Sequence, residues 1–153
     1  MSSRFVENFL MSPSGNSNDG VTPNPGVVYD GTLALAAAMT TVPVNVLNMD
    51  DFSIAFSTPG GATLVGTLTL QASNDQSGQE LTKTSDKLLQ NWETISVWDV
   101  GAGAQAASKA VASGAQVLLL AERVCTYRWV RLAFAFTSGT ALATIRFQAK
   151  GWP

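Results

Sequence analysis

The chain has 153 residues, of which 46% are hydrophobic and 13% are charged, and its formal net charge is −2. This length suits one domain whose core needs no metal or disulfide for stability. The charged fraction is about half of the usual ~25%, which indicates that another chain covers part of the surface. Nine lysines and arginines without a basic run do not form the basic stripe of a nucleic-acid binder, so we expect no nucleic-acid partner.

Residues 1–26 are predicted to form an extended N-terminal arm that precedes a domain of residues 27–153. Turn-forming residues fill positions 12–20, and two prolines follow. Residues 1–10 lack the long apolar stretch of a secretory signal peptide, and no apolar run approaches the ~18 residues of a membrane span. Such an arm is either loose or ordered on a neighbouring subunit. For the second case the candidate partner-binding residues are Arg4, Phe5, Phe9 and Leu10.

After residue 27, apolar and polar residues alternate with the period of half-buried strands. A polar loop is expected over residues 73–91. Trp92 and Trp98 would share one face of the strand that follows this loop. The pattern predicts strands over residues 41–46, 51–56, 64–72 and 92–98.

The C-terminal third predicts three more strands. Residues 101–114 are rich in alanine and glycine and are expected to hold one short helical turn or none. The apolar run at 116–121 is predicted to be a strand buried on both faces. Residues 126–136 and 140–150 flank Ser138 and Gly139 and predict a hairpin. Its register would pair apolar residues on one face, namely Phe136 with Ala141, Phe134 with Ala143, Leu132 with Ile145, and Val130 with Phe147.

The other face of this predicted hairpin carries the remaining candidate partner-binding residues, Trp129, Arg131 and Arg146. The register would place Arg131 opposite Arg146, and like charges in that position are destabilising unless another group compensates. Stacking of Trp129 on a guanidinium is one solution. A carboxylate from a loop of this chain or from an outside partner is another.

Roughly eight or nine strands with short turns predict an all-β fold. We expect a two-sheet antiparallel sandwich, of jelly-roll or similar Greek-key kind, with an extended N-terminal arm.

The residue types present also limit the chemistry. The absence of histidine removes Ser-His-Asp and Cys-His triads and most transition-metal sites. Cys125 is the only cysteine, so it forms neither an internal disulfide nor a zinc site by itself, and we interpret it as a small buried residue. No glycine motif for phosphate binding is present. We therefore predict no catalytic residues, no metal, no cofactor and no enzymatic activity.

Several segments carry a resemblance to a known class of proteins. These are residues 66–75, Asn91 with Trp92, residues 127–132, residues 137–140 and residues 149–151. Together they resemble small β-sandwich structural proteins of tailed bacteriophages, over residues 52–151. The resemblance implies a capsid decoration, cement or minor capsid protein, commonly a homotrimer, that binds the major capsid protein or other virion proteins. It implies a location in the virion, after assembly in the host cytoplasm.

An alternative function is a carbohydrate-binding β-sandwich module, either receptor-binding or spike-associated. The four tryptophans, among them Trp92 and Trp98, supply the aromatic rings that sugar-binding platforms use, although core packing and subunit contact use the same residues.

Overall fold

The computed structural model describes residues 5–11, 32–74, 92–123 and 125–151. Within these ranges the chain forms β-strands and no helix, and none of it is a helix of the length and hydrophobicity needed to cross a membrane. The strands are β1 (Phe5–Leu10), β2 (Leu33–Leu35), β3 (Met39–Thr40), β4 (Val44–Asn45), β5 (Met49–Thr58), β6 (Val65–Ser73), β7 (Glu93–Ile95), β8 (Val97–Asp99), β9 (Ala104–Ala106), β10 (Lys109–Val111), β11 (Gln116–Glu122), β12 (Trp129–Ser138) and β13 (Ala141–Gly151).

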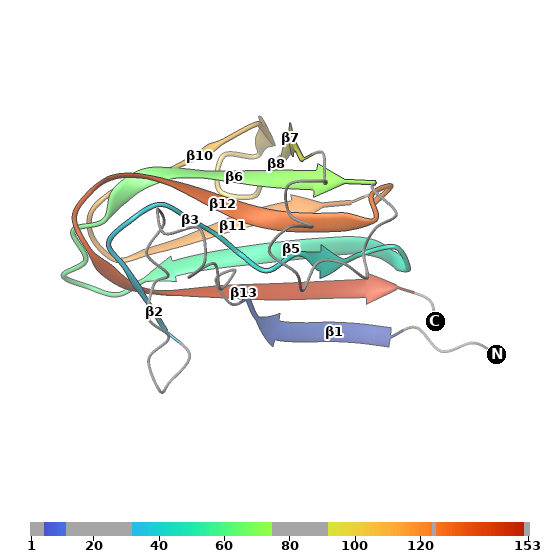
Figure 1. The fold of residues 1–153 in the computed structure, drawn as a ribbon, viewed down its shortest axis with the longest axis horizontal. Coiled ribbons are helices and arrows are strands. Elements are labelled where there is room, and N and C mark those ends of the chain that lie inside the picture. Colours follow the sequence, from blue (N-terminus) through green and yellow to red (C-terminus); the bar gives the residue numbers. More distant parts are fainter. Residues whose placement is uncertain (1–4, 12–31, 75–91, 124, 152–153) are drawn as a thin grey trace, which may run out of the picture.

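The strands form two antiparallel sheets. The first sheet has the order β1-β13-β5-β11-β8-β9, with β2 also paired to β13. The second sheet has the order β10-β6-β12-β3, with β4 paired to β12 and β7 paired to β6. In Figure 1, β6 and β12 lie in one layer above β5 and β13, and β1 runs along the outer edge of β13.

The path of the chain alternates between the two sheets. The long strands β5, β11 and β13 belong to the first sheet, whereas β6 and β12, which follow β5 and β11 in sequence, belong to the second. This arrangement of two antiparallel sheets is a jelly roll. The predicted all-β two-sheet sandwich is therefore confirmed.

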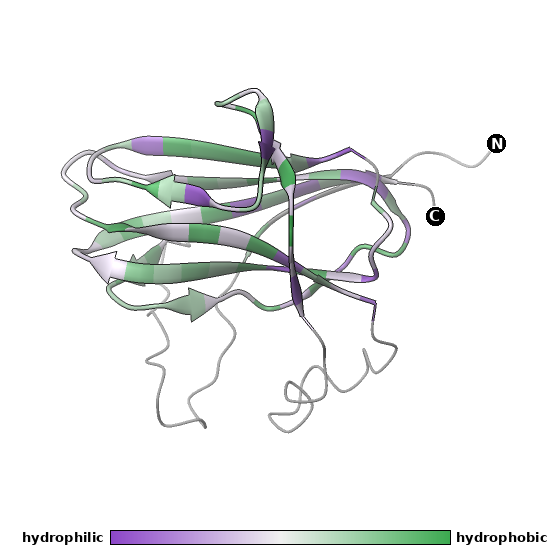
Figure 2. Ribbon diagram, turned by 90° about the horizontal axis from the view of Figure 1, so that it is seen from above, coloured by the Kyte–Doolittle hydropathy of each residue, from purple (hydrophilic) through white to green (hydrophobic). Residues whose placement is uncertain are grey.

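The core lies between the sheets and follows from the alternation of residue types along the strands. In β5 every second residue from Phe52 to Thr58 is buried, and in β6 the same holds from Gly66 to Ala72. Figure 2 shows the corresponding bands of hydrophobic and hydrophilic residues along the strands. Across the core, the rings of Phe56 and Phe134 stack with centroids 6.2 Å apart.

The predicted hairpin between the last two strands is wrong. β12 pairs with β6, with Phe134 opposite Leu68, whereas β13 pairs with β5, with Phe147 opposite Ile54. The turn at Gly139 (φ 79°) carries the chain from one sheet to the other. The apolar residues that the predicted register would pair are nearly all buried. Those of β12 and those of β13, however, lie on opposite sides of the core. Two strands that pair in one sheet and two strands that face each other across the core show the same alternation of inward apolar residues. The alternation therefore does not distinguish the two arrangements.

The structure describes only residues 5–11 of the predicted N-terminal arm, and these residues pair with the first sheet. Phe5–Leu10 is strand β1, in register with β13 from Phe5 opposite Gly151 to Leu10 opposite Arg146. The Met11 amide donates to the Ile145 carbonyl (2.8 Å), and β2 pairs with the same strand two residues further on, with Leu33 opposite Ala143. β1 and β2 therefore continue one another along a single edge of β13. Residues 1–4 and 12–31 lie outside the described part.

The single strand predicted over residues 92–98 is divided between the sheets. β7 pairs with β6 of the second sheet, and β8 pairs with β11 of the first. Trp92 and Trp98 therefore do not share a face. The alanine- and glycine-rich residues 101–114 hold the short strands β9 and β10. The predicted loop over residues 73–91 lies mostly outside the described ranges.

Strand β11 was expected to be buried on both faces, and this is wrong. Leu118 and Leu120 lie opposite the buried Phe56 and Ile54 of β5 and face the core. Val117 and Leu119 lie on the other face and are 69% and 38% exposed. One face of the apolar run therefore packs in the core, and the other face lies on the molecular surface.

Candidate interaction surfaces

The predicted partner-binding residues do not form one surface. Leu10 and Arg146 lie opposite each other on the outer face of the first sheet. Trp129 and Arg131 lie on the outer face of the second sheet, so Arg131 does not oppose Arg146 as predicted. Phe5 and Phe9 are placed by the register of β1 opposite Gly151 and Phe147, and Arg4 is outside the described residues.

One half of the first sheet's outer face is apolar. The register places Leu10, Arg146, Ala55 and Leu119 in one row across four strands, and Thr144, Ser57 and Val117 in the next. The central strand β5 contributes only small outward side chains to these rows, so the larger apolar residues stand on either side of it. Five exposed residues define this apolar face: Leu10, Val100, Val117, Leu119 and Leu142.

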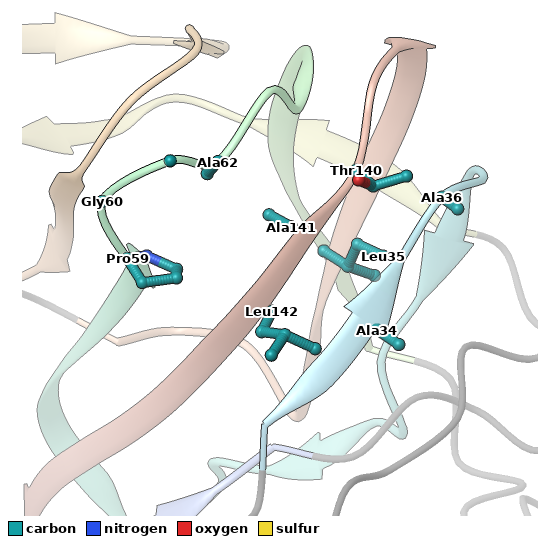
Figure 3. A pocket seen from close by; sticks show the side chains of 10 residues that line it. Ala34, Leu35, Ala36, Pro59, Gly60, Ala62, Thr140, Ala141 and Leu142 are labelled. Atoms are coloured by element: carbon teal, nitrogen blue, oxygen red, sulfur yellow. The ribbon is translucent and has the colours of Figure 1, made fainter.

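A surface hollow of about 350 Å³ extends this apolar face at the end of the sheet. Figure 3 shows Leu142 and Ala34 on neighbouring strands on one side of the hollow and Pro59 on the turn after β5 on the other. Leu35 and Ala141 are buried beneath it, and Leu142 is 49% exposed. The lining consists of small or apolar side chains and one threonine, so the hollow suits an apolar side chain of a partner.

The opposite end of the same sheet face is polar. A second hollow, of about 290 Å³, is lined there by small residues such as Ser53 and Ala121 and by charged ones such as Asp51, Arg123 and Lys150. Next to it the Arg123 guanidinium lies 5.0 Å from the centroid of the Trp98 ring. Arg146 Nη1 donates to Asn8 Oδ1 (3.1 Å) at the edge of the same face.

The outer face of the second sheet differs in character. Its rows are mainly threonine, alanine and glutamine, and Arg131 is the charged residue at its centre. The guanidinium of Arg131 lies 4.3 Å from the centroid of the Trp92 ring, and its Nε donates to Gln71 Oε1 (2.7 Å). Burial lowers the pKa of this guanidinium to about 10. The predicted stacking of a tryptophan on this arginine is thus made by Trp92, not by Trp129.

Two polar groups at the start of β12 are buried without a hydrogen-bond partner. They are Nε1 of Trp129, a residue that is 9% exposed, and Nε of Arg128. The backbone amide of Arg128 is satisfied, since it donates to Asn74 Oδ1 (2.9 Å). Buried donors without an acceptor are uncommon in folded proteins, and each costs free energy.

An ion pair joins the two sheets at one side of the sandwich. Lys109 on β10 of the second sheet donates from Nζ to Asp99 Oδ2 on β8 of the first (2.5 Å). This hydrogen bond lowers the pKa of Asp99, burial opposes the shift, and the Ala102 amide adds to it. Asp99 is buried and Lys109 is only partly exposed, so we assign this pair to fixing the two sheets against each other.

The described residues contain no group of three or more histidine, cysteine, aspartate or glutamate side chains that can hold a metal ion. Cys125 is half-buried, and its thiol is within 3.8 Å of the carbonyls of Val46 and Tyr127. Burial raises the pKa of this thiol, which lowers its reactivity.

No family model and no curated protein matches the sequence. Among solved structures, the SPBc2 prophage-derived protein YomS is similar with a TM-score of 0.60 and 7% identity, over 99% of this chain and 97% of that one. A protein described as CBM4 (13% identity, 96% and 87% coverage) and BiXyn10A CBM1 (11% identity, 98% and 96% coverage) each have a TM-score of 0.43. The likeness to YomS shows a shared fold, and the other two are too distant to inform either fold or function.

Proposed function

We propose that the chain is a structural protein of a bacteriophage particle, and more specifically a capsid decoration or cement protein. In this proposal it is a non-enzymatic homo-oligomer, a trimer, that binds the major capsid protein in the virion. The observation that carries the proposal is the apolar face of the first sheet, defined by Leu10, Val100, Val117, Leu119 and Leu142. Large exposed apolar side chains gathered on one face are typical of a surface that binds another protein.

The energetics of that face support a protein partner. Burial of apolar surface stabilises a complex by roughly 25 cal/mol per Å² before the cost of ordering is subtracted. The small outward residues Ser53, Ala55 and Ser57 leave a shallow path between Val117 and Leu119 on one side and Leu142 on the other. The hollow beside Leu142 provides a place for an apolar anchor, which is the usual centre of a tight interface.

Two further facts support the phage assignment. The protein YomS, whose fold matches this chain over nearly all of both lengths, is a prophage-derived protein. The low charged fraction of 13% fits a chain whose surface is partly covered after assembly.

The experiment that tests this proposal is the analysis of particles of the phage that encodes the chain. The particles are purified on a density gradient, and their proteins are quantified by mass spectrometry. We expect a copy number comparable with that of the major capsid protein. Absence of the chain from purified particles would contradict the proposal, whereas a few copies per particle would favour a tail or spike position over the capsid surface. Light scattering of the purified protein then tests the trimer.

A second candidate function is binding of a carbohydrate at the polar end of the first sheet. The specific observation that favours it is the 290 Å³ hollow, which combines small residues with hydrogen-bonding side chains such as Gln148 and Arg123. Trp98 lies beside it, in the row of Ala121. A glycan array on the wild-type protein and on Trp98→Ala distinguishes the two functions: specific hits that the substitution removes support the sugar site, and an array without hits removes this candidate.

A further inference from the structure

The shallow path along β5, on the outer face of the first sheet, is about as wide as one extended chain. Its floor consists of the small outward residues Ser53, Ala55 and Ser57, which are all half-buried. Longer side chains stand on both neighbouring strands, and Ala55, for example, lies between Arg146 of β13 and Leu119 of β11. Paired strands are about 4.8 Å apart, so β13 and β11 are about 10 Å apart, which leaves room for one extended segment.

The two ends of this shallow path differ in charge. At one end, the exposed side chains beside it are Val117 and Leu142, next to the hollow of about 350 Å³. Toward the other end, which holds the hollow of about 290 Å³, the exposed side chains include the cations Arg146, Lys150 and Arg123. A ligand that fills the whole length therefore meets an apolar surface first and a basic surface second.

The acids near the basic end do not offset these cations. Two acids of the described residues line the hollow there, and Glu122 lies opposite the buried Phe52, on the inner face of β11. Asp51 is outward but half-buried, and it already takes part in an interaction within the chain. Neither aspartate nor glutamate occurs among the adjoining residues outside the described ranges, 1–4, 124 and 152–153. This end thus exposes an excess of positive charge, although the net charge of the chain is −2.

We propose that the shallow path binds an extended segment of the partner protein, with apolar side chains at one end and an aspartate or glutamate at the other. The acid pairs with Arg123 and Lys150, and the apolar side chains cover Val117 and the hollow beside Leu142. From the row of Ser57 to the row of Asp51 the strand advances by six residues, or about 20 Å. The acid and the apolar residues are therefore about six positions apart. This inference rests on the proposed function and adds the chemistry of the partner at the same face.

Two features favour a protein segment over a saccharide at the basic end. The aromatic ring next to the hollow is Trp98, and the Arg123 guanidinium lies 5.0 Å from its centroid, so this face of the ring is not open for stacking on a sugar. The basic end is also continuous with the apolar rows of the same sheet. A saccharide bound at one end would leave those apolar rows uncovered.

The test is rebinding of the purified full chain to particles that lack it, with the apparent affinity measured by sedimentation at about 50 mM and about 500 mM salt. Arg123→Gln/Lys150→Gln is compared with Thr67→Glu/Thr69→Glu, which lowers the net charge equally but on the second sheet. We expect the first variant to bind about tenfold more weakly at low salt and the control to bind like the wild-type chain. At high salt the difference should nearly vanish, because salt screens exposed charges.

The outcomes separate this inference from the proposed function. Wild-type affinity of Arg123→Gln/Lys150→Gln at low salt, or a wild-type affinity that salt does not change, would overturn the inference. If Val117→Glu/Leu119→Glu loses binding in the same assay, the proposed function still stands, and if that variant binds fully, the proposed function fails as well. Glycan-array hits that Arg123→Gln/Lys150→Gln removes, with unchanged binding to particles, would assign the basic end to a saccharide instead.

Carbodiimide cross-linking of occupied particles locates the segment, because it couples a lysine amine to a carboxylate in contact with it. We expect Lys150 to be joined to an aspartate or glutamate of the partner that has large apolar residues about six positions away. Lys150→Arg is the control, since it keeps the charge and the binding but removes the amine. A link to Asp51 alone, no link from Lys150, or an acid without apolar residues at that separation would contradict the proposed segment.

Discussion

The outer faces of the two sheets differ although the same core supports both. The face of the first sheet divides into an apolar half, with Val117 and Leu119, and a polar half, with Asp51 and Lys150. The face of the second sheet is built mostly of threonine and alanine around Arg131. The two hollows of about 350 and 290 Å³ lie on the first sheet's side, one at each end.

This difference shows where the low charge of the chain has its effect. If the shortage of charge were uniform, the outer faces of both sheets would expose large apolar side chains to the same extent. Instead, five of the eight exposed large apolar side chains lie on the first sheet, whereas Val42, Leu47 and Phe136 lie on or beside strands of the second sheet. We infer that the first sheet makes the extensive contact with a partner, and that the second sheet makes at most a local contact.

The largest expected effect comes from the core that the two faces share. Phe134 belongs to the second sheet and Phe147 to the first, and both rings are buried. Phe134→Ala and Phe147→Ala are each expected to lower the free energy of unfolding by about 3–5 kcal/mol, because each leaves a cavity. Chemical denaturation monitored by tryptophan fluorescence measures this. A loss below about 1 kcal/mol at either position would contradict the description of a common core.

A somewhat smaller effect is expected at the turn that joins the two sheets. Gly139 has a φ of 79°, and a Cβ there would lie 2.0 Å from the carbonyl oxygen of Thr63. Gly139→Ala is therefore expected to cost about 2–3 kcal/mol or more. Gly61 has a similar φ of 82° but open space around it, so Gly61→Ala costs only the backbone strain, about 1 kcal/mol. Thermal unfolding compares the two variants, and equal losses would contradict the close approach at Gly139.

A further effect concerns the ion pair that joins the sheet edges. Asp99 has a lowered pKa when folded, so its contribution to stability is fully present above its ordinary value of 3.8 and is lost as the pH falls through the lower folded value. Stability measured from about pH 5 to about pH 2 is expected to fall less steeply for Asp99→Asn than for the wild-type protein. Lys109→Met is the partner control. An unchanged pH profile in Asp99→Asn would show that other carboxylates dominate.

The smallest effect on stability is expected on the apolar face itself. Val117 is 69% exposed and Leu119 is 38% exposed, so Val117→Ser and Leu119→Ser should each change the free energy of unfolding by less than about 1 kcal/mol. Urea denaturation measures the change. A loss near that of Phe147→Ala would mean that these side chains serve the core and not a partner.

Parts of this structure could be predicted from the sequence, because strand periodicity directly encodes which residues face a core. The alternation of Phe52, Ile54 and Phe56, and of Leu68, Leu70 and Ala72, predicted strands β5 and β6 and the sandwich. The same alternation could not reveal that β12 and β13 belong to different sheets. Phe134 and Ala143 need the same burial in a hairpin and across a core, and only the pairing with β6 and β5 separates these cases.

The interaction surfaces were less predictable for a related reason. The run from Val117 to Leu120 is apolar throughout, so its sequence does not reveal that one face is exposed. The signal in the sequence was the set of small outward residues Ser53, Ala55 and Ser57 on the neighbouring strand β5. Side chains of this size do not cover the outer face of β11. Arg131 was predicted to need a compensating group, and the structure places Trp92 against its guanidinium, but Trp92 comes from a segment distant in sequence.

The central claim is that the apolar face of the first sheet is the contact with the particle. The direct measurement is rebinding of the purified chain to particles that lack it, with occupancy quantified after sedimentation. The Val117→Glu/Leu119→Glu variant is compared with a Thr67→Glu/Thr69→Glu control, which places the same two charges on the outer face of the second sheet. We predict loss of occupancy for the first variant and near wild-type occupancy for the control. Full occupancy of Val117→Glu/Leu119→Glu, or loss confined to the control, would contradict the claim.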